Sequence, residues 1–184
     1  MPEPIELTTA RLVLSTPTSD DVDAIFAACQ DPDIQRFTTV PSPYRREDAE
    51  SFVALVAQWW ESGAEYTWAM RDAAGLVGMI GLHGIRDAAA EIGYWVAAPA
   101  RGRGYLTEAA DAVLDFAFGP MRLERVEWRA VTDNPASAAA ARKLGFRYEG
   151  LLRKGLGRIG GARRDGHIAA LLSTDPRTPQ PWPL

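Results

Sequence analysis

The chain has 184 residues, 47% of them hydrophobic and 24% charged, which fits one globular domain with a sizeable core. A formal net charge of −4 argues against a nucleic-acid partner. The single cysteine, Cys29, excludes an intrachain disulfide, and with two separated histidines it offers no metal-ligand spacing, so we expect no metal. No basic and apolar leader or apolar run of about 20 residues is present, so we expect a cytoplasmic protein without a membrane partner.

Apolar periodicity in the first half of the chain predicts helices followed by strands. The expected elements are a strand at 11–16, helices at 19–30 and 46–63, and strands at 65–72, 75–85 and 90–97. Ser19 is the expected N-cap of the first helix, and Gly63 supplies the stop of the second. Because only short turns separate the three later strands, they favour an antiparallel meander.

The second half continues the alternation of strands and helices. The expected elements are a loop before a helix at 105–118, a strand at 124–131, a helix at 134–145, and strands at 146–154 and 167–174. Residues 1–174 are therefore predicted to form one α+β domain with a mostly antiparallel sheet. The proline-rich tail, 175–184, is expected to lie loose or to pack by Trp182 alone.

The segment "PARGRGYLTEAADAVLDFAF", residues 99–118, joins a glycine and arginine loop to a helical pattern. The first turn of a helix leaves backbone N–H groups without intrahelical acceptors, and glycine lets an anion approach them closely. Arg101 and Arg103 add positive charge, so the segment predicts a pyrophosphate site. A P-loop would need G-K-[ST], and a dinucleotide fingerprint would need glycine at Thr107. A solvated surface turn is the alternative.

The loop fits the pattern R/Q-x-x-G-x-G/A, with Arg101 and Gly104 at the first and fourth positions. Further matching segments occur in the same order, namely "TARLVLSTP", "LVGMIGLHGI", "AEIGYWV", "ARGRGYLTEA", "LERVEWRAVTDNPAS" and "KLGFRYEGLLRKG". On these residues the chain resembles the GNAT superfamily of acyl-CoA-dependent N-acyltransferases, in the branch of ribosomal-protein N-terminal (alanine) acetyltransferases. The resemblance covers roughly Thr9 to Thr174. Two positions depart from it: Leu106, where Gly or Ala is usual, and Ala141, where many members have tyrosine.

The resemblance implies a GNAT fold, with the sheet splayed between its fourth and fifth strands and helices on its flanks. Acetyl-CoA would lie in the V-shaped cleft there, where an amine attacks its thioester directly. The residues that the resemblance assigns to acetyl-CoA are Val96, Arg101, Gly102, Arg103, Gly104, Tyr105, Leu106, Asn134 and Ser137. The N–H near Val96 would stabilise the oxyanion. Gly93, inside a strand, is expected to mark a bulge or a close backbone approach.

The reaction needs a group that accepts a proton from the amine and one that assists the leaving thiolate. Glu91 is the first candidate for the base, Glu65 the second and Glu127 the third, with solvated acids as the alternative. Ser137 is the candidate acid, because the resembling branch has a serine three residues after the asparagine. Capping of a helix by Asn134 explains that asparagine equally well.

Other reactive side chains are expected to be structural. Cys29 lies in an apolar helical pattern, which favours a core position over an acyl-carrying thiol. His83, alone on a strand, is expected to be a satisfied structural residue, and the tryptophans are expected to serve packing first.

These observations predict an acetyl-CoA-dependent N-acetyltransferase that acts on a protein or peptide N-terminus. A small amine, such as an aminoglycoside or polyamine, is one alternative. A non-catalytic CoA-binding regulatory module is another, since the usual tyrosine is missing. Residues 1–120 carry 8 Arg and 18 acids, whereas residues 121–170 carry 11 Lys or Arg and 5 acids, so we expect a cationic acceptor at the acidic N-terminal part. Monomer and homodimer are both left open.

Overall fold

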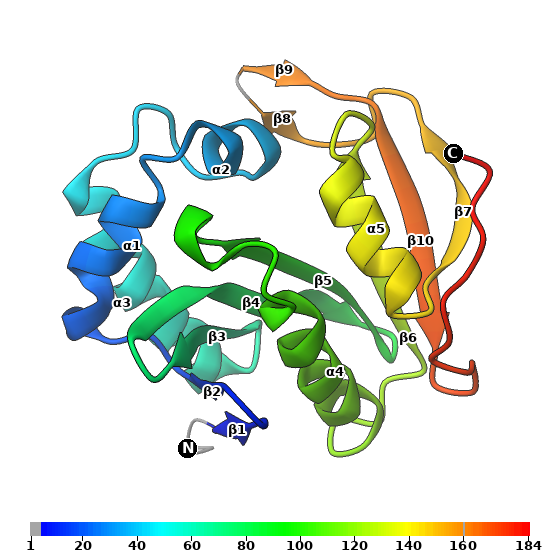
Figure 1. Cartoon of the computed structure of the whole chain (residues 1–184), viewed down its shortest axis with the longest axis horizontal. Coiled ribbons are helices and arrows are strands. Elements are labelled where there is room, and N and C mark those ends of the chain that lie inside the picture. The colour runs from blue at the N-terminus through cyan, green and yellow to red at the C-terminus, as the bar shows by residue number, and fades with distance from the viewer. Residues whose placement is uncertain (1–4, 160) are drawn as a thin grey trace.

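The computed structural model describes residues 5–159 and 161–184. In this part of the chain eight strands form one sheet in the order β1-β2-β3-β4-β5-β6-β10-β7, and β8 pairs with β9 in a separate hairpin (Figure 1). The strands are β1 (Leu7–Thr8), β2 (Val13–Ser15), β3 (Tyr66–Asp72), β4 (Gly75–Arg86), β5 (Ala89–Val96), β6 (Arg125–Val131), β7 (Arg147–Leu152), β8 (Arg158–Ile159), β9 (Ala162–Arg163) and β10 (Gly166–Leu172). Within the large sheet only β5 and β6, among the described strands, pair in parallel.

Helices flank this sheet, as the sequence predicts. They are α1 (Val22–Ala28), α2 (Pro32–Phe37), α3 (Arg46–Ser62), α4 (Tyr105–Phe118) and α5 (Pro135–Lys143), with short 3-10 turns at Ser19–Asp21 and Ala98–Ala100. Figure 1 shows α4 and α5 in front of the sheet, whereas α1 and α3 lie together beside its N-terminal half. No helix among the described residues is long and apolar enough to cross a bilayer.

Two apolar clusters form the core, one on each face of the sheet. In the first cluster Leu114 of α4 packs with Ile92 and Tyr94 of β5. In the second, residues of α1 and α3 pack with Met79 of β4 and Trp95 of β5. Because successive side chains of a strand point to opposite faces, Tyr94 and Trp95 face different layers of the molecule.

The strands β5 and β6 part halfway along their length. Their parallel register runs from Ala89 opposite Arg125 to Ile92 opposite Trp128 and ends there. Gly93–Val96 continue β5 along β4, and among the described strands they have no partner on the β6 side. This confirms the predicted splay, since β5 and β6 are the fourth and fifth of the strands expected from the sequence.

The expected bulge at Gly93 is wrong. The β4–β5 register passes through Gly93, opposite Gly81, without a shift, and the irregularity falls between His83 and Arg86. The glycine instead permits a close approach, because a Cβ at position 93 would lie 2.7 Å from Nε2 of His83. The imidazole ring therefore occupies the space that any other side chain at this position would need.

Local signals located the long elements well and the short ones poorly. The helix expected at 46–63 is α3, and Gly63 ends it in the left-handed conformation. The helix expected at 19–30 is a 3-10 turn followed by α1, and its N-cap is Thr18 rather than Ser19. The sequence analysis missed β1, α2, the 3-10 turn at Ala98–Ala100 and the β8–β9 hairpin.

The C-terminal tail is held at more points than Trp182. The Trp182 side chain is buried and donates from Nε1 to the Phe146 carbonyl at 2.9 Å. The backbone N–H of Gln180 donates to the Arg142 carbonyl at 3.0 Å. Arg177 pairs with carboxylates on α4. These contacts fasten the tail across α4, α5 and β7.

Candidate active site

The loop before α4 presents unpaired backbone donors. Gly102 and Gly104 have φ angles of +73° and +79°, a left-handed conformation that favours glycine. Gly104 is the N-cap of the 14-residue α4, and no side chain of the described residues caps this end of the helix. Within the described residues, the N–H groups of Gly102, Arg103 and Gly104 have no acceptor. They lie at the positive end of the helix dipole, where an anion binds favourably.

The two residues that follow turn their side chains away from these donors. The Tyr105 ring is buried, and its hydroxyl donates to Oδ2 of Asp72 at 2.9 Å. Leu106 packs against the first core cluster. Both side chains are thus engaged elsewhere, and the bulk of Leu106 lies against the core.

Arg101 does not face these donors, contrary to the expectation that it adds charge to them. Its guanidinium lies 3.1 Å from Oδ1 of Asp31, and its Nε donates to the Val96 carbonyl at 3.0 Å. The physical reason is α2, the helix that the sequence analysis missed, since Asp31 caps its first turn and Asp33 follows. Burial opposes the shift, but hydrogen bonds from Arg101 and from backbone N–H groups hold the pKa of Asp31 below its ordinary value.

The guanidinium groups of Arg103 and Arg11 both lie against the Tyr105 ring. Their guanidinium carbons are 4.8 and 4.7 Å from the ring centroid. Arg11 pairs with Glu108 of α4 at 2.6 Å and donates to the Arg103 carbonyl at 2.9 Å, so it braces the loop. Arg103 is half exposed, and its contact with Asp72 is loose at 3.7 Å. Arg103 is thus the arginine of this loop that is available to an anion.

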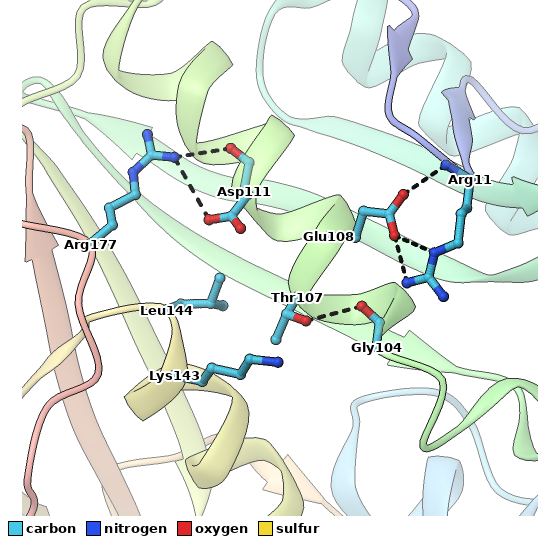
Figure 2. Close-up of a pocket in the computed structure, with 8 residues that line it drawn as sticks. All are labelled: Arg11, Gly104, Thr107, Glu108, Asp111, Lys143, Leu144 and Arg177. Atoms are coloured by element: carbon cyan, nitrogen blue, oxygen red, sulfur yellow. Dashed lines mark hydrogen bonds and ion pairs between the residues drawn. The ribbon is translucent and has the colours of Figure 1, made fainter.

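A pocket of about 390 Å³ adjoins the loop between α4, α5 and the tail (Figure 2). It is lined by Arg11, Gly104, Thr107, Glu108, Asp111, Lys143, Leu144 and Arg177. Figure 2 shows Lys143 extending from α5 toward Thr107. Arg11 and Arg177 are paired with carboxylates of α4. Lys143 makes no ion pair within 4.0 Å among the described residues, although its charge acts on the Asp111 carboxylate at longer range. Its ammonium is a cation that sequence reasoning missed.

The backbone of β5 faces the splay with free groups. The N–H of Ala97 donates to the Val77 carbonyl of β4 at 2.9 Å. Because N–H groups alternate in direction along an antiparallel strand, those of Tyr94 and Val96 point away from β4 and into the gap that β6 has left. Val96 therefore presents its N–H where the resemblance predicts an oxyanion donor.

Three side chains from separate elements meet beside this gap. The Tyr94 hydroxyl lies 2.9 Å from Oγ of Ser137, which stands at the start of α5. Nε1 of Trp128 lies 3.0 Å from that Oγ and 3.1 Å from the tyrosine hydroxyl. The Asn134 side chain accepts from the Ser137 N–H at 3.1 Å, which confirms its predicted role as a helix cap. Tyr94 is the second residue that sequence reasoning missed.

The candidate carboxylates lie on the other face of β5 and β6. Glu127 is clamped by Arg125 at 3.0 Å and Arg129 at 2.6 Å, and despite partial burial these hydrogen bonds hold its pKa below the ordinary value. Glu91 has only a looser contact with Arg129, at 3.6 Å. Burial raises the pKa of Glu91, while Arg129 and His83 act in the opposite direction. Glu91 is therefore the better proton acceptor of these two.

Glu65, the second candidate base, is paired with His83. Its Oε2 lies 2.9 Å from Nδ1 of the imidazole, whose other edge rests against Gly93. The strand register sets His83 opposite Glu91. Glu65 thus orients a histidine on the face that carries Glu91, and His83 is satisfied at one nitrogen, as expected.

The comparisons with known proteins agree with this geometry. The model of the acetyltransferase (GNAT) domain matches residues 11–147. The chain belongs to this family. An uncharacterized N-acetyltransferase of Bacillus subtilis, YoaA, is 31% identical over 152 residues, which span 80% of this chain and 86% of that protein.

Solved structures of GNAT proteins superpose over almost the whole chain. RimJ of Mycobacterium smegmatis in complex with CoA-disulfide gives a TM-score of 0.79 at 25% identity and covers 92% of this chain and 86% of its own. The ribosomal L7/L12 α-N-protein acetyltransferase RimL gives 0.84 at 20% identity, with 92% and 94% covered, which bears on the fold alone.

The chain is thus a GNAT N-acetyltransferase, and acetyl-CoA is its co-substrate. The loop fits such a donor, because a Cβ at Gly102 would meet no atom within 4 Å and the neighbouring N–H groups have no acceptor among the described residues. Cys29 takes no part in this site. It is buried in the second core cluster, and burial raises the pKa of its thiol to about 11, which opposes a role as an acyl-carrying thiolate.

Proposed function

We propose that this GNAT enzyme acetylates the N-terminal amine of a protein or peptide, by direct attack of the amine on acetyl-CoA. One observation carries the proposal. A carboxylate able to accept a proton, Glu91, and a hydroxyl able to donate one, Ser137, flank the same splay from opposite faces of the sheet. Donor and acceptor can therefore approach from two sides and meet where β5 and β6 part.

The donor is held from the α4 and α5 side. The N–H groups from Gly102 to Leu106 and the Arg103 side chain take the pyrophosphate, and Lys143 serves the nucleotide end in the adjoining pocket. Arg101 acts indirectly, because its pairing with Asp31 fixes the loop to α2. Acetyl-CoA supplies the acetyl group as a thioester.

The acceptor is deprotonated from the other face. A peptide α-amine has an ordinary pKa of about 7.7–8.0, so it is mostly protonated at pH 7, and it attacks only as the neutral form. Glu91 takes that proton, directly or through water, and its raised pKa makes it a stronger base than an exposed glutamate. Glu127, with its lowered pKa, stabilises the sheet instead. The Val96 N–H donates to the carbonyl oxygen as it gains charge.

A hydroxyl donor assists departure of the thiolate. Thiols have pKa values near 8.5, so the thiolate leaves without full protonation, but a hydrogen bond from Ser137 still stabilises it. Ala141, at the position where many GNAT members carry tyrosine, is fully buried and supplies no donor. The hydroxyls of Ser137 and Tyr94 weigh against a non-catalytic module.

The number of acidic residues in the N-terminal part of the chain overstates how strongly this part attracts a cationic acceptor. Several N-terminal carboxylates are neutralised locally, as in the pairs Asp21–Arg71 and Asp23–Arg46. Attraction for a cationic acceptor rests on the exposed acids that remain, such as Glu61. A protein acceptor is supported instead by a relative from Bacillus subtilis, 40% identical over 83 residues that span 44% of this chain, whose name is "Putative ribosomal N-acetyltransferase YdaF".

The proposal is tested with acetyl-CoA and a library of peptides with free N-termini. N-terminally blocked copies of the same peptides, which retain their lysines, are the matched control, and a polyamine and an aminoglycoside represent small amines. Thiol release together with tandem mass spectrometry should locate the acetyl group on the α-amine of free peptides only. Equal turnover of the blocked peptides, or turnover of the small amines alone, would overturn the peptide N-terminus as acceptor.

A further inference from the structure

The Tyr94, Trp128 and Ser137 side chains form a cluster whose protons can be counted. The indole N–H of Trp128 only donates, and it lies within hydrogen-bond distance of both oxygens. The two hydroxyls, 2.9 Å apart, share one hydrogen bond in which either can be the donor. One hydroxyl proton is therefore left over, and its direction decides whether the cluster can assist a leaving group.

Two arrangements satisfy this count. If Ser137 donates to Tyr94, the phenol can donate only to the Ser137 carbonyl oxygen, 3.4 Å away. Neither hydroxyl then has a proton directed into the splay. If Tyr94 donates to Ser137, Oγ accepts from both the phenol and the indole. The serine proton then has no acceptor among the described residues and is free for a ligand. Both arrangements use the 2.9 Å contact between the two hydroxyls. The first adds only the long contact of 3.4 Å, which is weak, whereas the second keeps the serine proton for a ligand.

We infer that Tyr94 is the positioning residue of this GNAT active site: its phenol donates to Ser137 Oγ and thereby directs the serine proton to the leaving thiolate. The inference rests on the proposed function of Ser137 as the donor. The chain has Ala141 where a tyrosine is common, and its phenol comes from β5 instead. Trp128 of β6 completes the arrangement, because its indole N–H lies within hydrogen-bond distance of both oxygens.

Burial argues that the phenol keeps its proton. Burial of Tyr94 raises its pKa, while its hydrogen bonds with Ser137 and Trp128 act in the opposite direction. A tyrosinate in this cluster is therefore disfavoured, and the tyrosine acts through the serine rather than as a separate acid. Removing the phenol hydroxyl should accordingly matter only while the serine hydroxyl is present.

A double-mutant cycle tests this dependence. Ser137→Ala should lower kcat about 100-fold, the lower end for acid assistance. Tyr94→Phe should lower kcat about tenfold, the effect of one hydrogen bond, with KM for acetyl-CoA within about twofold of the unmodified enzyme. The double variant should equal Ser137→Ala, because the tyrosine acts through the serine. Multiplying losses, or an unchanged kcat in Tyr94→Phe, would overturn the inference.

The matched control is Tyr148→Phe. Tyr148 belongs to the same core cluster, and its hydroxyl lies 3.1 Å from a different partner, Nδ1 of His167. Its loss should leave kcat unchanged. Equal denaturation midpoints for the two phenylalanine variants would show that a loss of kcat in Tyr94→Phe is not a loss of folded protein.

A second measurement needs no acceptor and so separates this inference from the peptide proposal. The thiol of bound CoA is titrated by the ultraviolet absorbance of its thiolate. A serine proton aimed at the sulfur stabilises the thiolate, so the bound thiol should titrate at lower pH in the unmodified enzyme than in Tyr94→Phe or Ser137→Ala. Titration at one pH in all three proteins would overturn the role of Tyr94, whether or not a peptide is acetylated.

Discussion

Arg101 of the loop before α4 is paired with Asp31, the N-cap of α2, with 3.1 Å between the guanidinium and Oδ1. The pair joins residues 70 positions apart and fastens the loop to the helix beside it. The arginine that fits the family pattern therefore shapes the loop, and the backbone donors from Gly102 onward are left to the anion.

Replacement of Asp31 by asparagine should reveal this pairing through pH. Asn retains the helix cap but loses the charge. The pKa of Asp31 is lower in the folded protein than its ordinary value of about 3.9. Ionised Asp31 therefore stabilises the fold at pH values above about 3.9, and this stabilisation is lost as the pH falls through the folded-state pKa. In urea denaturation, Asp31→Asn should be less stable than the parent at neutral pH, and the difference should shrink in acid.

The control for this prediction is Asp33→Asn. Its carboxylate is more exposed and lies 3.6 Å from Arg101, so the change should have a smaller effect. A difference for Asp31→Asn that stayed constant from neutral pH to acid would argue against the ion pair.

Two substitutions of Gly102 that differ only in charge test whether the backbone N–H groups of the loop bind the pyrophosphate. Asp and Asn are almost isosteric, and both tolerate the left-handed conformation that this residue adopts. A Cβ at this position would meet no atom of the described residues within 4 Å, so neither variant should clash. By calorimetry, Gly102→Asp should bind CoA far more weakly than Gly102→Asn. Equal affinities for the two variants would move the pyrophosphate away from this loop.

Lys143 should contribute to the nucleotide end of CoA through its charge. Lys143→Gln should bind CoA more weakly than the parent, and the loss should diminish as salt rises, because screening is already strong beyond about 8 Å at physiological ionic strength. Lys154→Gln makes the same charge change on an exposed residue outside the pocket. If both variants lose the same affinity, the effect is one of net charge, and the pocket has no special role.

Long elements and the donor loop could be predicted because their signals are local. Gly63 ends α3 and the glycines precede α4 in the chain itself, so pattern and turn chemistry were enough. The short α2 could not be recognised from six residues. Because α2 was not predicted, the pairing of Arg101 with Asp31 was not predicted either, and the charge of Arg101 was assigned to an anion in the loop.

Most of the site depends on contacts between distant segments. Ser137 was found from its spacing to Asn134, but its partners Tyr94 and Trp128 come from two other strands. Gly93 was recognised as unusual, yet its cause is the side chain of His83 on the neighbouring strand rather than a bulge. Such relationships arise from strand register, which a single sequence does not specify at this detail.

Glu91→Gln and Glu127→Gln should shift stability in opposite directions. The pKa of Glu91 is higher in the folded protein than its ordinary value of about 4.3. The fold therefore loses stability as the pH rises from about 4.3 through the folded-state pKa, and glutamine, which cannot ionise, avoids this loss at neutral pH. The Glu127 pKa is lowered, so its charge stabilises the fold above about 4.3 and glutamine should destabilise. Chemical denaturation at neutral pH compares the two variants.

Activity should separate the same pair of variants. Glu91→Gln should lower kcat/KM most for amines that are largely protonated at the assay pH, and less for amines that are already neutral. Glu127→Gln should show no such dependence on the amine. A uniform loss for Glu91→Gln across all amines would assign Glu91 to structure and leave the base to another group.

The measurement that tests the account most directly is a crystal structure with CoA bound. The account predicts the pyrophosphate on the N–H groups from Gly102 to Leu106, the sulfur between Val96 N and Ser137 Oγ, and an open path from the sulfur to Glu91 on the opposite face. Phosphates bound elsewhere, or a thiol directed away from the splay between β5 and β6, would contradict it.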